Sequence, residues 1–278
     1  MLHHLESETI KISVSNTGAE LQSLYSKETG TEYLWQGDPA WWGSCAPVLF
    51  PVIGALKDGS LPKHGFVRRA YFYAKHGPNA LIFEYTDNPL TRAVYPYAFT
   101  FSVVFSLDEN VLNIENRVEN KSGTEMYCSV GAHEAYACGG NFDDFFIEFE
   151  KEEKLESLEV NTKTGLLSGA AYPVALQNKR TLPLTHGLFE NDALIFKNIK
   201  NKKLAIKNTK RDASIEVSYD APNLGIWTKP GAPFVCIEPW WGLPDYDGSV
   251  GGLANKDGIV KINKNEDFIA RHSITVME

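Results

Sequence analysis

Glu238 is the residue whose surroundings most need a chemical explanation. It lies in residues 233–241, a run that is otherwise apolar and aromatic. A carboxylate in such surroundings is costly unless it is paired or takes part in chemistry. Burial would raise its pKa above the ordinary value of about 4.3 and suit it to act as a general base near neutral pH. A structural role, in which a strand-end glutamate reaches solvent or an arginine, is equally consistent with this stretch.

His133 is a second candidate for proton transfer. It ends residues 129–133, where the small residues beside it would let a ligand approach the ring closely. With an ordinary pKa of about 6.5, a histidine can donate a proton and recover it at cellular pH. A single histidine at the end of a strand is nevertheless more often structural, and this stretch alone favours that role.

Hydrogen bonds to a polyol would suit three further side chains. His64 and Arg68 flank the turn at Gly65, and Asp192 precedes an apolar run at residues 193–196. A turn histidine and an Asx turn would explain the same residues without a ligand. Asp192 and Glu238 would also suit a paired-carboxylate glycosidase, which requires a separation that sequence cannot give.

Aromatic side chains are abundant enough to cover the apolar faces of a sugar ring, although tryptophan is also a common core residue. The six tryptophans are Trp35, Trp41, Trp42, Trp227, Trp240 and Trp241. No pair of histidines or cysteines has the spacing of a metal site, so we expect no metal. The four cysteines are scattered, and we expect them to be reduced and mostly buried.

Alternating apolar and polar residues predict the strands that must position these groups. The clearest pair is a hairpin formed by residues 97–107 and 112–118, joined by a turn at residues 108–110. Further strands are predicted at residues 10–14, 66–74, 80–85, 145–149, 213–219 and 268–276, with one short helix at residues 90–94. The lysine-rich residues 197–210 fit the solvated face of a hairpin, and the charged residues 151–159 fit an edge strand or a loop. Many short strands with frequent turns indicate an all-β sandwich or barrel.

Composition narrows the class of protein. The chain has 278 residues, of which 43% are hydrophobic and 22% charged, which is typical of a globular protein. We expect a single domain over residues 1–278, since large β folds reach this size. The net charge of −8 opposes binding to nucleic acid or anionic membranes. Without a signal peptide or a membrane-spanning run, we expect a cytoplasmic protein.

Taken in order, several segments resemble the aldose 1-epimerase (galactose mutarotase-like) family, and more closely its LacX-like branch. They are residues 18–24, 46–51, 64–68, 131–133, 189–196 and 236–240, with Leu253, Lys256, Gly258 and Ile259 resembling the closing segment. Each segment is a weak signal, but their shared order over nearly the whole chain is specific.

The resemblance implies a large antiparallel β sandwich with an open sugar-binding cleft, and interconversion of the α and β anomers of a hexose. By the matched segments, Glu238 would be the base and His133 the acid, while His64, Arg68 and Asp192 would bind the substrate. Ring opening moves one proton off and one proton on, so no cofactor is expected. The partner would be a small sugar, bound by a monomer or a homodimer.

Two departures from the family pattern bear on the substrate. Ala55 stands where many relatives carry an arginine, so Lys57 or Arg68 would have to supply that contact. Glu134 replaces the usual proline after His133, and we expect it to reshape the loop and alter the pKa of the histidine.

Two alternatives to a mutarotase of free hexoses stay open. The same cleft would suit a carbohydrate-binding protein without catalysis, which would not need both His133 and Glu238. It would also suit a mutarotase acting on a hexose 6-phosphate, with the phosphate held by basic residues among Lys57, Lys63, Arg68 and Arg69.

Overall fold

A computed structural model describes residues 1–278, and its strands follow the alternation of the sequence. The expected hairpin is confirmed as β6 (Phe99–Asp108) and β7 (Val111–Asn120), paired antiparallel in continuous register from Phe99 opposite Asn120 to Asp108 opposite Val111. Phe99, Phe101 and Val103 are fully buried. The apolar face of this hairpin therefore contributes to the core, as a period of two requires.

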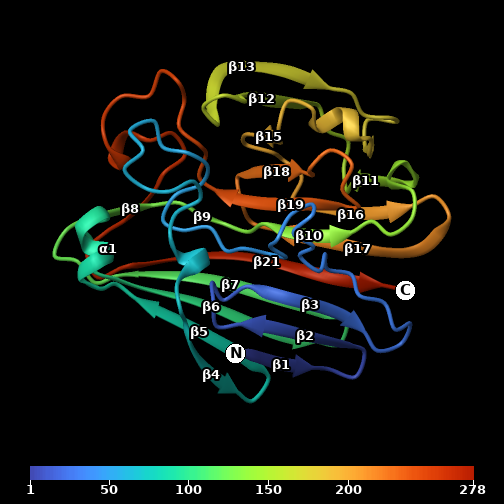
Figure 1. Cartoon of the computed structure of the whole chain (residues 1–278), viewed down its shortest axis with the longest axis horizontal. Helices are drawn as coiled ribbons and strands as arrows, with labels where there is room; N and C mark the ends of the chain where they lie inside the picture. The colour runs from blue at the N-terminus through green and yellow to red at the C-terminus, as the bar shows by residue number, and fades with distance from the viewer.

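The larger of two main sheets has nine strands (Figure 1). Their spatial order is β14 (Thr181–Pro183), β11 (Phe145–Phe149), β16 (Lys203–Asn208), β17 (Arg211–Tyr219), β21 (Asp267–Met277), β7, β6, β5 (Ala80–Thr86) and β4 (Tyr73–Gly77). All of its pairings are antiparallel.

The second main sheet has seven strands and contains Glu238. Its order is β10 (Glu134–Ala137), β19 (Phe234–Trp241), β18 (Asn223–Trp227), β15 (Leu194–Phe196), β12 (Leu155–Asn161) and β13 (Leu166–Val174), and β9 (Val130–Gly131) also pairs with β19. All eight residues of β19 are buried, which explains the unbroken apolar composition of this strand.

Smaller elements complete the chain. A three-stranded sheet contains β1 (Leu2–Glu6), β2 (Ile10–Ser15) and β3 (Leu21–Ser26), and a two-stranded sheet contains β8 (Met126–Cys128) and β20 (Val260–Ile262). The helices are α1 (Pro89–Val94) and the 3-10 turns η1 (Val67–Arg69), η2 (Phe142–Asp144), η3 (His186–Phe189) and η4 (Leu253–Asn255). No helix is long and apolar enough to cross a membrane.

A shared core confirms the predicted antiparallel β sandwich. One cluster of 57 buried residues draws on both main sheets, including Phe101 and Ile274 from the nine-stranded sheet and Val235 and Leu224 from the seven-stranded sheet. The strands expected at residues 10–14, 80–85, 145–149, 213–219 and 268–276 are present, as is the short helix. The four cysteines are free and buried, as expected.

The prediction of one strand over residues 66–74 is wrong. His64 and Gly65 both have positive φ, and the amides of Phe66 and Val67 then donate to the carbonyl of Phe50. The chain therefore turns through η1 before β4 begins at Tyr73. Tertiary contacts override the local alternation here.

The predictions for the two charged segments have different outcomes. Residues 203–219 form the β16–β17 hairpin, which confirms the interpretation of the lysine-rich stretch for residues 203–210; residues 197–202 precede the hairpin and belong to no strand. In residues 151–159, the first four are outside any strand, but β12 lies between β13 and β15 and is not an edge strand. The edge is β13, whose residues 168–171 are exposed.

Candidate active site

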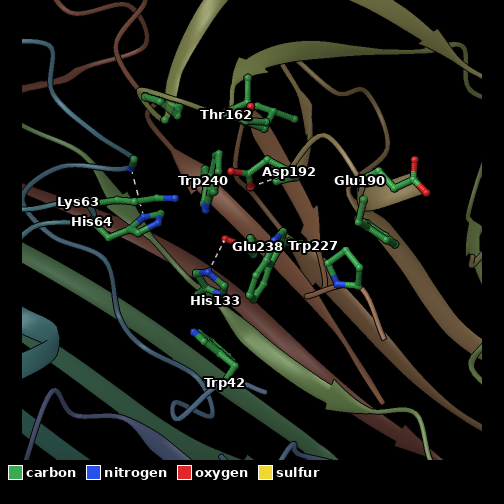
Figure 2. Close-up of a pocket in the computed structure, with 18 of the residues that line it drawn as sticks. Trp42, Lys63, His64, His133, Thr162, Glu190, Asp192, Trp227, Glu238 and Trp240 are labelled. Carbon is green, nitrogen blue, oxygen red and sulfur yellow. Dashed lines mark hydrogen bonds and ion pairs between the residues drawn. The ribbon is translucent and has the colours of Figure 1, made fainter. Parts of the chain in front are cut away.

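A cleft of about 500 Å³ collects residues from distant parts of the chain. All five predicted site residues line it: His64, Arg68, His133, Asp192 and Glu238. Figure 2 shows His64, His133, Asp192 and Glu238 converging on the cleft from different elements. Isolated bridges link Gly65 to Phe50 and Leu49 to Gly131, which pairs with β19, so the turn of His64 is brought to the strand of Glu238.

His133 and Glu238 form the centre of the cleft. His133 lies between β9 and β10, and Glu238 lies on β19, which pairs with both strands. The Nε2 atom of His133 lies 3.3 Å from Oε2 of Glu238. On β18, a Cβ atom at Gly225 would lie 3.2 Å from the Cβ of Glu238, so the glycine leaves room for the glutamate.

Gly131, two residues before His133, has a different role from the one expected for the small residues of this stretch. A Cβ atom at Gly131 would lie 3.0 to 3.1 Å from side-chain atoms of Trp240, Ile53 and Leu49. Gly131 therefore admits neighbouring protein side chains and not a ligand. Its lack of a side chain allows β9 to pack against Trp240 on the partner strand.

Burial sets the charge states of the central pair. His133 is 8% exposed and Glu238 is 1% exposed. Burial lowers the pKa of His133 to about 3, and the charges of Lys63 and Arg68 act in the same direction. Burial raises the pKa of Glu238 well above its ordinary range, Asp192 raises it further, and Lys63 opposes the shift. The cleft therefore favours neutral forms of both groups over an ion pair.

Three buried polar atoms of the cleft make no hydrogen bond within the protein, although one of them is the glutamate oxygen that lies 3.3 Å from Nε2 of His133. They are Nδ1 of His133, Oε2 of Glu238 and Nε1 of Trp240. Buried polar atoms are normally hydrogen-bonded, so each exception needs an explanation, and a ligand in the cleft would supply one for these three. The centre of the cleft can therefore accept and donate hydrogen bonds to a ligand.

Three of the six tryptophans form the walls of the cleft: Trp42, Trp227 and Trp240. Trp42 stacks on the ring of His133 at 4.9 Å between centroids, and Trp227 meets that ring edge-on at 5.9 Å. These aromatic contacts fix the orientation of the imidazole. Trp35, Trp41 and Trp241 do not line the cleft.

His64 is held in one tautomer by the backbone. Its main chain has φ of 65°, its amide donates to the carbonyl of Gly54, and its Nδ1 accepts from the amide of Gly54 at 3.2 Å. Burial lowers the pKa of His64 well below its ordinary range, with His133 and Lys63 as further causes. A neutral His64 accepting at Nδ1 carries its proton on Nε2, which makes it a hydrogen-bond donor.

Asp192 and Arg68 offer charged groups to the cleft. Asp192 has φ of 81°, and its Oδ1 accepts from the amide of Ala193 at 2.8 Å. Its carboxylate points into the cleft near Trp240 (Figure 2). Arg68, from η1, is partly buried and takes part in none of the ion pairs of the chain.

The sequence matches the aldose 1-epimerase family model over residues 1–259. The chain belongs to the aldose 1-epimerase family. The chromosomal and plasmid LacX proteins of Lactococcus lactis subsp. lactis are each 29% identical to it over 301 residues, covering 100% of both chains in each comparison. This likeness supports the predicted LacX-like branch.

Solved structures of similar proteins confirm the mutarotase-like fold. The galactose mutarotase related enzyme from Lactobacillus acidophilus is 33% identical with a TM-score of 0.93, covering 100% of this chain and 98% of that chain. A galactose mutarotase-like protein from Lactobacillus casei ATCC 334 is 27% identical with a TM-score of 0.94, covering 100% of both chains.

The two departures from the aldose 1-epimerase pattern have different outcomes. Of the residues that could replace the arginine missing at Ala55, Lys57 lies outside the cleft. Lys63 and Arg68 both line it. Glu134 faces away from the cleft and lies 3.0 Å from Nε2 of His272 on β21. The expectation that Glu134 alters the pKa of His133 is not supported, since Glu134 is not among the causes of that shift but raises the pKa of Glu238.

The sequence did not single out several groups that line the cleft. Thr162, Glu190 and Pro230 lie on turns whose sequence carries no chemical signal. Lys63 is one of four neighbouring basic residues, and the sequence gives no reason to prefer it over the others. Figure 2 shows its side chain extending into the cleft from the turn that carries His64.

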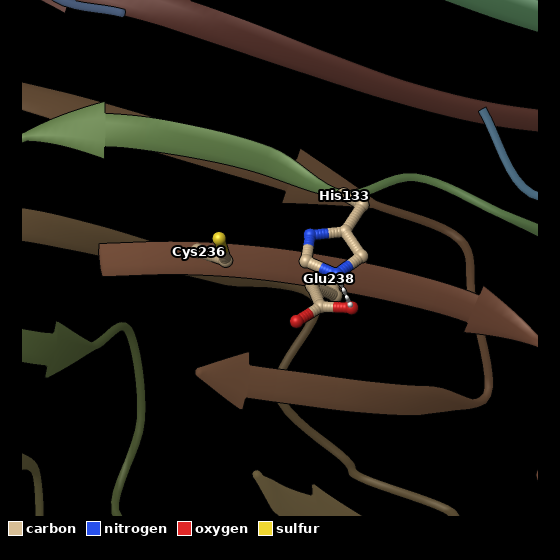
Figure 3. A group of neighbouring side chains, drawn as sticks. All are labelled: His133, Cys236 and Glu238. Carbon is tan, nitrogen blue, oxygen red and sulfur yellow. Dashed lines mark ion pairs between the residues drawn. The ribbon is translucent and has the colours of Figure 1, made fainter. Parts of the chain in front are cut away.

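Cys236 lies next to the central pair and completes a set of possible metal ligands (Figure 3). One ligand atom each from His133, Cys236 and Glu238 lies within 4.8 Å of the others. Thiolate, imidazole and carboxylate ligands suit zinc. Burial, however, raises the pKa of the Cys236 thiol well above its ordinary range, and Glu238 raises it further. A thiol held in its protonated form is a poor metal ligand, so the residues fit a zinc site poorly.

Proposed function

We propose that this protein is an aldose 1-epimerase that interconverts the α and β anomers of a hexose. The observation that carries the proposal is the 3.3 Å approach of His133 to Glu238 inside a cleft with aromatic walls. An acid and a base side by side are what ring opening requires, because one proton leaves the anomeric hydroxyl and another reaches the ring oxygen. Membership of the family supports this reaction class.

In the proposed reaction, Glu238 accepts the proton of the anomeric hydroxyl and His133 donates a proton to the ring oxygen. The C1–O5 bond breaks to give the open-chain aldehyde, which rotates about its C1–C2 bond. Attack of the O5 hydroxyl on the other face of the carbonyl then closes the ring, with the acid and base roles reversed. Each positioned acid or base contributes about a hundredfold to ten-thousandfold in rate.

The bound sugar must shift the central pair from its neutral forms. Hydroxyl groups that donate to Glu238 stabilise its carboxylate form, because a hydrogen bond to the charged form lowers the pKa. The proton that Glu238 releases passes to Nε2 of His133, 3.3 Å away, and the ring oxygen beside that atom then accepts it. His64, as an Nε2–H donor, and Asp192, as an acceptor, would hold other hydroxyls, with Arg68 at the same wall.

Polarimetry of freshly dissolved α-glucose and α-galactose tests the proposal. We expect micromolar protein to accelerate the approach to anomeric equilibrium for at least one of these sugars. Binding of the sugar without any acceleration would instead favour a carbohydrate-binding protein. Cleavage of a glycoside, seen as new sugar signals in the NMR spectrum, would favour a glycosidase.

A hexose 6-phosphate is a second candidate substrate. The observation in its favour is the pair of cations, Lys63 and Arg68, that line the cleft without an ion-pair partner. An arginine binds phosphate oxygens through two parallel hydrogen bonds. NMR exchange rates for glucose and glucose 6-phosphate separate the candidates: a kcat/KM at least tenfold higher for the phosphate would select it, and a lower value would exclude it.

A further inference from the structure

Lys63 lies at the end of a rigid turn that faces the central pair. On its C-terminal side, the amide of His64 donates to the carbonyl of Gly54, and the amide of Gly65 donates to the carbonyl of Pro62. The side chain of Lys63 lines the cleft, and Figure 2 shows its ammonium directed toward the space beside Glu238. These hydrogen bonds fix the backbone beside Lys63, so the turn holds the lysine charge at the cleft.

The charge of Lys63 is not neutralised elsewhere. None of the ion pairs or side-chain hydrogen bonds of the chain includes Lys63, whereas Lys256, for example, is paired with Asp245 at 2.6 Å. An exposed lysine would ordinarily remain in solvent, since its ammonium is strongly hydrated. Lys63 is exposed, so its ammonium stays hydrated and charged while its side chain lines the cleft, where that charge can act on Glu238.

Glu238 is the group for which this charge matters, because its acidic neighbours oppose its ionisation. Asp192, in the segment before β15, and Glu134 on β10 both raise the pKa of Glu238, although Glu134 points away from the cleft toward His272. The Cys236 thiol on the same strand as Glu238 stays protonated and adds no charge. His133 and His64 also line the cleft, and burial favours the neutral form of both imidazoles. Lys63 is the cation that lowers the pKa of Glu238.

We propose that Lys63 is the counter-charge of Glu238, holding the carboxylate in the form that accepts the anomeric proton. This inference rests on the proposed function for its role in catalysis, but the pairing of charges does not depend on turnover. Lys63 acts through Glu238, and it is therefore a positioning residue in the electrostatic sense. It also makes a protonated His133 a stronger acid, because the same charge lowers the pKa of that imidazole.

The proposal predicts the direction of a pH shift. Removing the Lys63 charge raises the pKa of both Glu238 and His133, so the window in which one of them holds a proton moves to higher pH. Lys63→Met and Lys63→Gln should therefore move both limbs of the kcat/KM profile upward by about one pH unit. The same variants should lose about tenfold in kcat/KM on the acid side.

The deciding experiment is a titration of Glu238 followed by NMR of protein with ¹³C-labelled glutamate carboxyl groups. The signal is assigned by its loss in Glu238→Gln. We expect the midpoint of Glu238 to rise by about one unit in Lys63→Met and Lys63→Gln and to be restored in Lys63→Arg. Lys57→Met, a lysine outside the cleft, serves as the control with unchanged midpoint and turnover.

Arg68→Gln separates Lys63 from a general effect of positive charge. Arg68 acts on His133 and His64 but is not among the main causes of the shift at Glu238, so this variant should move the Glu238 midpoint less than the Lys63 variants do. An unchanged midpoint in both Lys63→Met and Lys63→Gln overturns the proposal, even if activity falls. A shifted midpoint in a protein that does not accelerate mutarotation supports the charge pairing and rejects the proposed function.

Discussion

Glu238 occupies surroundings that oppose the charge required by its proposed role. It is buried, and the carboxylates of Asp192 and Glu134 act against its ionisation. A group in such a site binds a proton readily and releases it readily once a ligand stabilises the charged form. These are the properties that a residue needs if it is to act as base in one direction of a reaction and as acid in the other.

Asp192 should matter more for binding than for proton transfer. Its Oδ1 is held by the amide of Ala193, so the second oxygen is available to a substrate hydroxyl. Hydrogen bonds to charged groups contribute about 1.5 to 3 kcal/mol. We therefore expect Asp192→Asn to raise KM about tenfold to a hundredfold with kcat changed less than about threefold.

Steady-state kinetics of anomer exchange measures both parameters. The matched control is Asp212→Asn, an exposed aspartate outside the cleft that should retain wild-type values. A large fall in kcat with an unchanged KM would show that Asp192 takes part in the chemistry itself.

Residue by residue, the sequence revealed the site unevenly. Glu238 stood out because a carboxylate within an apolar strand is physically anomalous. His133 did not, and only the ordered resemblance to the family raised it above a structural histidine. Lys63 was harder still, because the direction of a lysine on a turn depends on backbone pairing with Gly54, ten residues away from His64 along the chain.

At the scale of elements, the turn at residues 64–65 carries His64 and Lys63 into the cleft. Gly65 has φ of 74°, and a Cβ atom there would lie 2.0 Å from the carbonyl oxygen of Phe50. We expect Gly65→Ala to lower the free energy of unfolding by about 2 to 4 kcal/mol, since both the backbone angle and the close contact oppose a side chain. Turnover should fall as the turn moves.

Gly59→Ala is the matched control, measured by urea denaturation alongside Gly65→Ala. Gly59 has φ of 64°, but a Cβ atom there would meet nothing within 4 Å. It should lose only about 1 kcal/mol, the effect of the backbone angle alone. Equal losses in the two variants would show that the contact with Phe50 is unimportant.

Glu134 joins the two main sheets directly behind β19, the strand that carries Glu238. It lies on β10, its partner His272 lies on β21, and both are buried. Removing one member of a buried pair leaves the other uncompensated and typically costs about 3 to 5 kcal/mol. We expect Glu134→Ala to lower the free energy of unfolding by that amount.

The neighbouring exposed pair provides the comparison for Glu134. Arg271 lies 2.9 Å from Glu115, and its side chain is 57% exposed. Exposed pairs contribute about 0 to 1 kcal/mol, so Arg271→Ala should change stability by no more than that. A loss below about 1 kcal/mol in Glu134→Ala, measured by the same denaturation, would contradict a structural role for the Glu134–His272 pair.

Strands with a strict period of two could be predicted, and those without it could not. β6 and β7 alternate over ten residues each, and their pairing followed from the pattern. The short strands β9 and β10, which carry His133 between them, are too brief for periodicity to reveal. The prediction for residues 66–74 was wrong because the carbonyl of Phe50, which is distant in sequence, accepts hydrogen bonds from the amides of Phe66 and Val67.

For the whole molecule, the central pair predicts how stability depends on pH. The pKa of Glu238 is raised on folding, so the folded state holds its proton more tightly than the unfolded state does. Stability from this group is fully present below the unfolded pKa of about 4.5 and is lost as pH rises toward the folded pKa. The pKa of His133 is lowered to about 3, so its contribution is present above pH 6.5 and is lost as pH falls.

We therefore expect Glu238→Gln to be more stable than the wild type near neutral pH. Its advantage should grow with pH by up to about 1.4 kcal/mol per unit above pH 4.5, until the folded pKa of Glu238 is reached. His133→Asn should lack the loss of stability that this imidazole causes in the wild type as pH falls from 6.5 toward 3. Thermal unfolding from pH 4 to 9 measures both trends, and an advantage of Glu238→Gln that shrinks with pH would contradict the burial of a neutral carboxyl.

The most direct test of the proposed reaction is NMR exchange between the α and β anomers at equilibrium, with the wild type and two variants. The wild type should transfer magnetisation between the anomeric protons of glucose or galactose at a rate proportional to protein concentration. His133→Asn and Glu238→Gln should each reduce that rate by at least about a hundredfold, while still binding the sugar. Near-normal exchange in either variant would contradict the assignment of the acid and base.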